Sequence, residues 1–388
     1  MGALSVKLFL VAGEASGDKL GAALMAALID LVPGVTFAGI GGPQMEALGL
    51  QSLFPMEELS VMGLLEVLPK YRQLKRRIAE TAQAALETAP DALITIDSPD
   101  FCLRVARIVK AARPAQKTVH YVAPSVWAWR PGRAAKMAEV IDHVLALLPF
   151  EPPYMTAAGM SCDFVGHPVV AEPRATEAEA TALRQTLMIG PDQPVLLCLP
   201  GSRRGEVKRL MPRFAATVAA LRQDVPGLRV LIPTVRGVAA EVRKMACRWD
   251  EVPNVISDAA EKRAAFATAN LALAASGTVS LELAANRVPM VIGYRMNWLT
   301  WHITKRAMLI DTVTLVNLVS ETRAVPEFLG RPCRPKPMAR ALQDLLRDPQ
   351  RRAAQVSAME TTMQRLGEGG AAPGLRAAQS VLAFLQRG

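Results

Sequence analysis

The segment VLLCLPGSRRGE, from Val195 to Glu206, decides the fold because it joins a strand to a helix through a basic turn that contains glycine. Its apolar run Val195–Leu199 is typical of a buried strand, and a helical pattern follows from about Glu206. Short buried strands that alternate with longer helices form parallel sheets with crossover helices. Ligands of such sheets bind beyond the carboxyl ends of the strands. The sequence therefore predicts an α/β fold with a ligand site at this turn.

Gly201, Ser202 and Arg203 form the predicted binding loop, with Arg204 next to them. A helix N-terminus, a glycine and two guanidinium groups together bind a diphosphate without a metal. The loop is not a P-loop, because the lysine followed by serine or threonine is missing. A solvated basic turn is the alternative. The pattern leaves open which arginine makes the main phosphate contact.

Strand and helix patterns alternate through both halves of the chain. A break at Pro168–Arg174 separates two doubly wound domains, for which we expect residues 1–168 and 169–349, with the helices of 350–388 completing the first domain. The expected strands are Val6–Ala12, Thr36–Ile40, Ala92–Ile96, Thr118–Val122, Val144–Leu148, Val195–Leu199, Arg229–Ile232, Val255–Ile256, Leu271–Ala274 and Met290–Ile292.

Composition favours a reducing compartment and an anionic partner. The 388 residues carry a net charge of +10, and the five cysteines include no CxxC pair. The four histidines lack ligand spacing, so no metal site is expected. No run approaches the roughly 20 apolar residues that span a bilayer, so membrane contact would be peripheral. The basic residues are dispersed, which disfavours nucleic-acid binding.

Two further small-residue turns follow strands. Gly13, Glu14 and Ser16 lie in the turn after Val6–Ala12, which lacks the GxGxxG spacing of dinucleotide-binding proteins. A tight turn capped by Ser16 is the alternative reading. In the turn after Leu271–Ala274, N–H groups face a phosphate and a glutamate reaches ribose hydroxyls, or the polar residues cap the helix. The residues of this second turn are Ser276, Gly277, Thr278 and Glu282.

Asp97 ends the strand Ala92–Ile96 and is the candidate general base. A carboxylate at this position faces the ligand end of the sheet and takes a proton from an attacking hydroxyl. Asp100 precedes the helix Phe101–Ala112 and fits the role of its N-cap.

The stretch Val61–Arg77 combines hydrophobic and basic residues, which is the composition of a segment that contacts a membrane surface. The alternative is a buried helix followed by an exposed basic one, which would have the same sequence pattern. Tryptophans near Arg130 either line a pocket or fill core. The residues expected to contact membrane or acyl chains are Met62, Leu64, Leu65, Leu68, Arg72 and Trp298.

An ordered set of motifs resembles the lipid A disaccharide synthase family of inverting glycosyltransferases. The motifs are AGEASGD at 12–18, MEELSVMGLLEVL at 56–68, IDSPDF at 96–101, HYVAPSVWAWR at 120–130, FVGHP at 164–168, LPGSR at 199–203 and SGTVSLE at 276–282. The resemblance covers most of the chain. Ser98 and Arg204 depart from the family pattern, where a small apolar residue and no second charge are expected.

The resemblance implies a GT-B fold, with a cleft between two Rossmann-like domains and a C-terminal helix that packs back on the first. It implies transfer from UDP-2,3-diacylglucosamine to 2,3-diacylglucosamine 1-phosphate, giving the β-1,6 disaccharide 1-phosphate and UDP, with no cofactor. The family's essential aspartate falls on Asp97, its diphosphate arginine on Arg203 and its late asparagine on Asn317. The resemblance also implies that Glu14 and Ser16 line the same cleft.

The implied setting is the cytoplasmic face of the inner membrane, whose anionic surface is a partner, and a homodimer stays open. One alternative is another UDP-sugar enzyme of the fold, such as a UDP-N-acetylglucosamine 2-epimerase, which would act on a soluble sugar nucleotide. Another is a non-catalytic nucleotide- or lipid-binding protein, which a product assay would distinguish.

Overall fold

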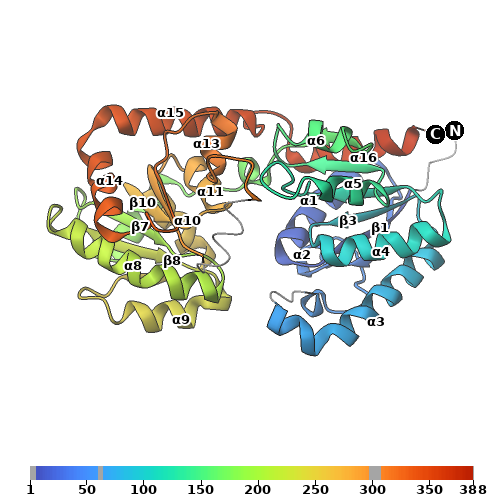
Figure 1. The fold of residues 1–388 in the computed structure, drawn as a ribbon, viewed down its shortest axis with the longest axis horizontal. Coiled ribbons are helices and arrows are strands. Elements are labelled where there is room, and N and C mark those ends of the chain that lie inside the picture. Colours follow the sequence, from blue (N-terminus) through green and yellow to red (C-terminus); the bar gives the residue numbers. More distant parts are fainter. Residues whose placement is uncertain (1–5, 60–63, 297–306, 388) are drawn as a thin grey trace. The chain divides into compact units, whose positions relative to one another are not determined.

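The computed structural model describes residues 6–59, 64–296 and 307–387 (Figure 1). It divides into two compact units: Met1–Ala171 with Gly369–Gly388, and Glu172–Glu368. Each unit contains a six-stranded sheet in which all pairs are parallel. The predicted α/β class is confirmed.

The sheet of the first unit has the order β2-β1-β3-β4-β5-β6. Its winding direction reverses between β1 and β3, so the loops after these two strands flank a switch point. The five residues Leu8 to Ala12 of β1 are all buried, which explains the continuous apolar run at the start of the chain. The strands are β1 (Lys7–Ala12), β2 (Thr36–Ile40), β3 (Ala92–Ile96), β4 (Thr118–Tyr121), β5 (His143–Ala146) and β6 (Ser161–Phe164).

Helices cover this sheet in two layers: α1 packs on α16, and α3 packs on α4 (Figure 1). The helices are α1 (Ala15–Leu31), α2 (Pro43–Glu46), α3 (Leu64–Thr88), α4 (Pro99–Ala112), α5 (Gly132–Ala138), α6 (Pro152–Thr156) and α16 (Pro373–Gln386), with 3-10 turns at Met56–Glu58 and Pro168–Ala171.

The sheet of the second unit has the order β12-β11-β10-β7-β8-β9, and its switch point lies between β7 and β10. The strands are β7 (Val195–Leu199), β8 (Arg229–Pro233), β9 (Asn254–Ile256), β10 (Leu271–Ala274), β11 (Met290–Tyr294) and β12 (Glu327–Leu329). The helices are α7 (Glu177–Thr186), α8 (Arg204–Arg222), α9 (Arg236–Ala246), α10 (Ala259–Thr268), α11 (Val279–Ala285), α13 (Leu315–Ser320), α14 (Pro335–Arg347) and α15 (Pro349–Arg365).

All ten expected strands are present, but the sequence pattern missed β6 and β12. Both are edge strands whose residues are only half-buried, so they lack a continuous apolar run. The first boundary falls three residues later than expected, after the 3-10 turn Pro168–Ala171.

The expectation that all of 350–388 completes the first unit differs from the structure, because α15 belongs to the second. This helix packs on α11 and α13. The buried amide of Gln355 accepts from the N–H of Met290 and donates to its carbonyl, which ties α15 to β11. Only residues 369–388 return to the first unit.

Helix α16 is attached to the first unit by buried polar contacts. His143 lies at the start of β5, between the hydroxyls of Ser161 and Ser380 at 2.8 Å each. Ser380 also donates to Asp163 Oδ2 at 2.7 Å, and the His143 ring stacks on Phe384. A C-terminal helix that packs back on the first domain is thus confirmed.

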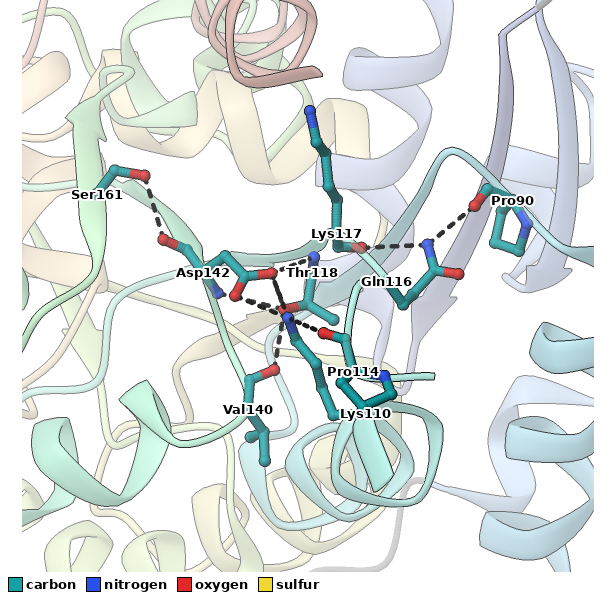
Figure 2. A network of polar contacts seen from close by, with 9 residues as sticks. All are labelled: Pro90, Lys110, Pro114, Gln116, Lys117, Thr118, Val140, Asp142 and Ser161. Carbon is teal, nitrogen blue, oxygen red and sulfur yellow. Dashed lines mark hydrogen bonds and ion pairs between the residues drawn. The ribbon is translucent and has the colours of Figure 1, made fainter. Parts of the chain in front are cut away.

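The same end of the sheet carries the polar network of Figure 2. The Asp142 carboxylate accepts from Lys110 Nζ and from both the N–H and the hydroxyl of Thr118. In Figure 2 the Lys117 side chain extends away from this cluster. Its Nζ donates to the carbonyls of Leu385 and Arg387, at the end of α16. The amino ends of β4 and β5 are therefore fixed structurally, which leaves the opposite edge for ligands.

We expect the attachment of α16 to weaken in acid. Burial lowers the pKa of His143 below its ordinary 6.5, although Asp163 acts in the opposite direction. A lowered folded-state pKa gives stability that is present above the unfolded pKa and is lost as the pH falls through the folded one. The urea midpoint should therefore fall more steeply below about pH 6.5 in the wild type than in His143→Gln. Equal slopes in the two proteins would contradict this.

Candidate functional site

The loops after β1 and β3 meet at the switch point of the first unit. A Cβ added at Gly13 would lie 2.6 Å from Ser98 Oγ, so glycine allows the two loops to approach this closely without a shift of the Ser98 side chain. The hydroxyl of Ser16 donates to Asp97 Oδ2 at 3.2 Å. Two of the predicted groups, Ser16 and Asp97, are thus brought together.

Asp97 has a strained backbone. Its φ is +54° and that of Ser98 is +43°, whereas residues other than glycine rarely have positive φ. The Asp97 N–H donates to the carbonyl of Tyr121 at 2.9 Å and so continues the ladder between β3 and β4. The residue is half-buried. Strain of this kind persists where surrounding structure imposes it, typically at functional sites.

Asp18 is a residue whose structural importance the sequence pattern did not reveal. It is 2% exposed, and its carboxylate accepts from the backbone N–H groups of Gly42, Gln44 and Met45 at 2.9 to 3.0 Å. These donors lie at the start of α2, where intrahelical acceptors are missing. Asp18 therefore holds α2 against α1. Glu14, by contrast, is half-buried and occupies the N-cap position of α1.

The second switch point is built from the loops after β7 and β10. Gly201 has a φ of +105° and Gly277 a φ of +131°, conformations that favour glycine. Ser202, Arg203 and Arg204 are exposed. The predicted phosphate loops are therefore neighbours across the pair β7–β10.

Arg203 is the N-cap residue of α8, a helix of 19 residues that begins at Arg204, two residues earlier than expected. Within the described part of the chain, neither Arg203 nor Arg204 forms an ion pair, and the neighbouring Glu206 accepts from the Tyr294 hydroxyl. Two exposed guanidinium groups at the positive end of a long helix favour an anionic ligand.

The loop after β10 carries the residues predicted to bind phosphate and ribose. Ser276 and Gly277 are half-buried and Thr278 is exposed, but the Thr278 side chain does not cap α11. Glu282 pairs with Lys262 Nζ at 2.9 Å. A ribose contact from Glu282 would therefore compete with, or share, this lysine.

Asn317 is 1% exposed, and its amide is used within the protein. It donates to Thr312 Oγ1 and to the carbonyl of Val325, and accepts from the Val325 N–H at 3.0 Å. These bonds join the segment before α13 to the one before β12. The structure gives Asn317 a positioning role, and its expected donor contact stays a prediction.

The expected membrane contacts fall mostly where little can be described. Met62 and Trp298 lie outside the described residues, as do the side chains of Leu64, Leu65 and Leu68 in α3. Arg72 is exposed. Among the helices that the structure describes, none is long and apolar enough to cross a membrane. The described histidines, cysteines and carboxylates form no group that could hold a metal ion.

The family model described as lipid-A-disaccharide synthetase matches residues 8–378. The chain is 62% identical to a lipid-A-disaccharide synthase of Ruegeria pomeroyi, over 97% of this chain and 95% of that protein. It is 48% identical to one of Rhodospirillum centenum, over 97% and 94%.

Solved structures of other enzymes share the fold. A UDP-GlcNAc 2-epimerase of Neisseria meningitidis, bound to UDP-GlcNAc, has a TM-score of 0.67 at 11% identity. The match covers 99% of this chain and all of the epimerase chain. The calicheamicin glycosyltransferase CalG4 has a TM-score of 0.59 at 18% identity, and the match covers 99% of this chain and 98% of the CalG4 chain. At these identities the likeness shows the fold alone, the two-domain GT-B fold.

We expect Gly201→Ala to weaken nucleotide binding. The alanine would have to adopt the positive φ of Gly201, which destabilises the fold by roughly 1–2 kcal/mol. Its Cβ would lie 2.9 Å from Glu206 Cβ. Gly227→Ala is the matched control, since Gly227 has a φ of +78° and meets no atom closer than 3.9 Å. Both variants should lose stability, but only Gly201→Ala should lose UDP affinity by calorimetry. Equal UDP affinities would remove the loop from the site.

Proposed function

Because the chain belongs to the lipid-A-disaccharide synthetase family, we propose that its two switch points serve the two substrates of one glycosyl transfer. The donor is UDP-2,3-diacylglucosamine and the acceptor is 2,3-diacylglucosamine 1-phosphate. The acceptor 6-oxygen forms the new bond to the anomeric carbon, the bond from that carbon to UDP breaks, and the hydroxyl proton leaves. The products are the β-1,6 disaccharide 1-phosphate and UDP.

Asp97 takes the hydroxyl proton in this proposal. The observation that carries it is the carboxylate at the carboxyl end of β3, on a strained backbone at the switch point of the first unit. Ser16 donates to one carboxylate oxygen, Oδ2, and so fixes its orientation. The other oxygen, Oδ1, then faces the acceptor as general base.

The second unit stabilises the leaving UDP. Negative charge grows on the diphosphate as its bond to the sugar breaks, and preorganised donors at that point lower the barrier. The N-terminus of α8 and the exposed Arg203 supply such donors. Gly201 allows the backbone to come close to the phosphates. We propose that these groups do the work of a divalent metal.

The enzyme works at the surface of the cytoplasmic membrane in this proposal, since both substrates carry acyl chains. The stretch Val61–Arg77, whose residue Arg72 is exposed, provides the membrane contact together with Trp298. Anionic lipids attract such basic residues. A homodimer is compatible with this arrangement.

Asp97→Asn should lower the turnover number roughly 10²- to 10⁴-fold, because the isosteric amide cannot accept the proton. UDP affinity should stay unchanged, since Asp97 belongs to the first unit. Asp100→Asn is the matched control: this exposed residue lies three positions on, in the first turn of α4. Disaccharide formation is measured with purified substrates. Wild-type turnover of Asp97→Asn would remove it from the base role.

Turnover should be insensitive to excess EDTA and should not rise on addition of magnesium, because the arginine and the helix N-terminus meet the leaving charge. Arg203→Ala should lower the turnover number on the order of 10²-fold under the same conditions. Activity that is lost with EDTA and restored by magnesium would contradict the metal-free proposal.

A further inference from the structure

Glu151 is a buried carboxylate that links the loops after β4 and β5. It is 4% exposed and lies five residues beyond β5. Its Oε1 accepts from Trp127 Nε1 at 3.2 Å, across to the loop after β4. Its Oε2 accepts from the backbone N–H groups of Leu147 and Leu148 at 3.2 and 3.0 Å. One carboxylate thus joins two loops through three hydrogen bonds.

This carboxylate is retained at a cost. Among the described residues, no lysine or arginine forms an ion pair with Glu151, and burying an unpaired carboxylate is unfavourable. Burial raises its pKa to about 7, against the opposing effect of the three hydrogen bonds. If the link between the two loops served the fold alone, a neutral side chain would provide it with a smaller desolvation penalty. Groups perturbed in this way gather at functional sites.

The tryptophan that Glu151 holds begins an aromatic and basic segment. Trp127 is buried, and its ring meets Phe150 edge to face, with centroids 5.0 Å apart. Two residues on, the half-buried Trp129 lies under the Arg130 guanidinium at 4.3 Å. Arg130 has a φ of +53°, so the chain turns sharply here. Fixing the Trp127 indole therefore fixes where Trp129 and Arg130 point.

The loop after β4 is also next to Asp97. The Asp97 N–H donates to the carbonyl of Tyr121, and the Val122 N–H donates to that of Leu145. The loops after β3, β4 and β5 therefore leave neighbouring strands at the same edge, and such strands are about 4.8 Å apart.

We propose that Glu151 is a positioning residue for the acceptor. It holds the segment Trp127–Arg130 in place, so that this segment lines the acceptor site next to Asp97. The inference rests on the proposed function, which assigns the acceptor to the first unit. Trp129 supplies an aromatic face for a sugar ring, and Arg130 a guanidinium for the acceptor's phosphate. Glu151 itself touches neither substrate.

Protonation of Glu151 changes this arrangement. The added proton removes the negative charge and turns one oxygen into a hydroxyl, so the hydrogen bonds that this oxygen accepts from the N–H groups weaken. The neighbouring Cys162 on β6 stays neutral, because burial, followed by the charges of Glu151 and Asp163, raises the pKa of its thiol to about 12. His143 lies at the opposite end of β5, against Ser161 and Ser380. Glu151 is thus a group whose charge changes near neutral pH.

The test compares Glu151→Gln with Glu139→Gln, an exposed glutamate of the same unit that pairs with Arg107. We expect the KM for 2,3-diacylglucosamine 1-phosphate to rise roughly tenfold in Glu151→Gln, with UDP affinity and kcat within about twofold of the wild type. The control should match the wild type. Trp127→Phe removes the indole donor, so it should raise the same KM, and combining it with Glu151→Gln should add little further.

A pH profile separates positioning from a general loss of structure. The wild-type KM for the acceptor should rise below about pH 7 relative to that of Glu151→Gln, in which this titration is missing. The acceptor phosphate titrates near pH 6 in both proteins, so the difference between them isolates the enzyme. Superimposable profiles and an unchanged KM would overturn the inference. So would an equal loss of donor and acceptor affinity together with a lower urea midpoint.

These outcomes are distinct from those that bear on the reaction. Full turnover by Asp97→Asn would count against the proposed base. The expected loss in Asp97→Asn, together with unchanged acceptor kinetics in Glu151→Gln, would count against the positioning role alone.

Discussion

Each unit reverses its winding direction once, between β1 and β3 in the first and between β7 and β10 in the second, and the candidate site residues of each unit depend on its reversal. Crossover helices leave in opposite directions at such a point, so the carboxyl ends of the two central strands stay uncovered. Backbone N–H groups and polar side chains that would be costly in a core can lie there. Asp97 occupies one opening, and Gly201 with Arg203 occupies the other.

Much of this could be predicted from the sequence. The central strands are buried on both faces, so continuous apolar runs identify them in the sequence. The polar residues directly after these runs identify the end of the sheet where ligands bind. The loops with Gly13, Asp97, Gly201 and Gly277 were found in this way. Edge strands such as β12 were missed because half-buried residues give no continuous apolar run.

Other features depend on tertiary contacts and leave no periodic signal. Asp18 is an ordinary polar residue in the sequence, and only the return of the chain at α2 shows that it accepts three N–H bonds. Asn317 fitted a ligand contact, yet its amide is buried in bonds to its own unit. Gln355 decides which unit contains α15 through two bonds to Met290. Buried polar groups must be paired, so these residues hold parts of the chain together, whether or not Asn317 also contacts the donor as predicted.

The central claim is that the two openings serve a single inverting transfer between two acylated sugars. The most direct measurement is the structure of the product, obtained by incubating the purified protein with both substrates and determining the new linkage by NMR. The account predicts a β-1,6 disaccharide 1-phosphate, with one UDP released for each. An α-linked product would contradict inversion, and epimerised sugar nucleotide without disaccharide would contradict the transfer itself.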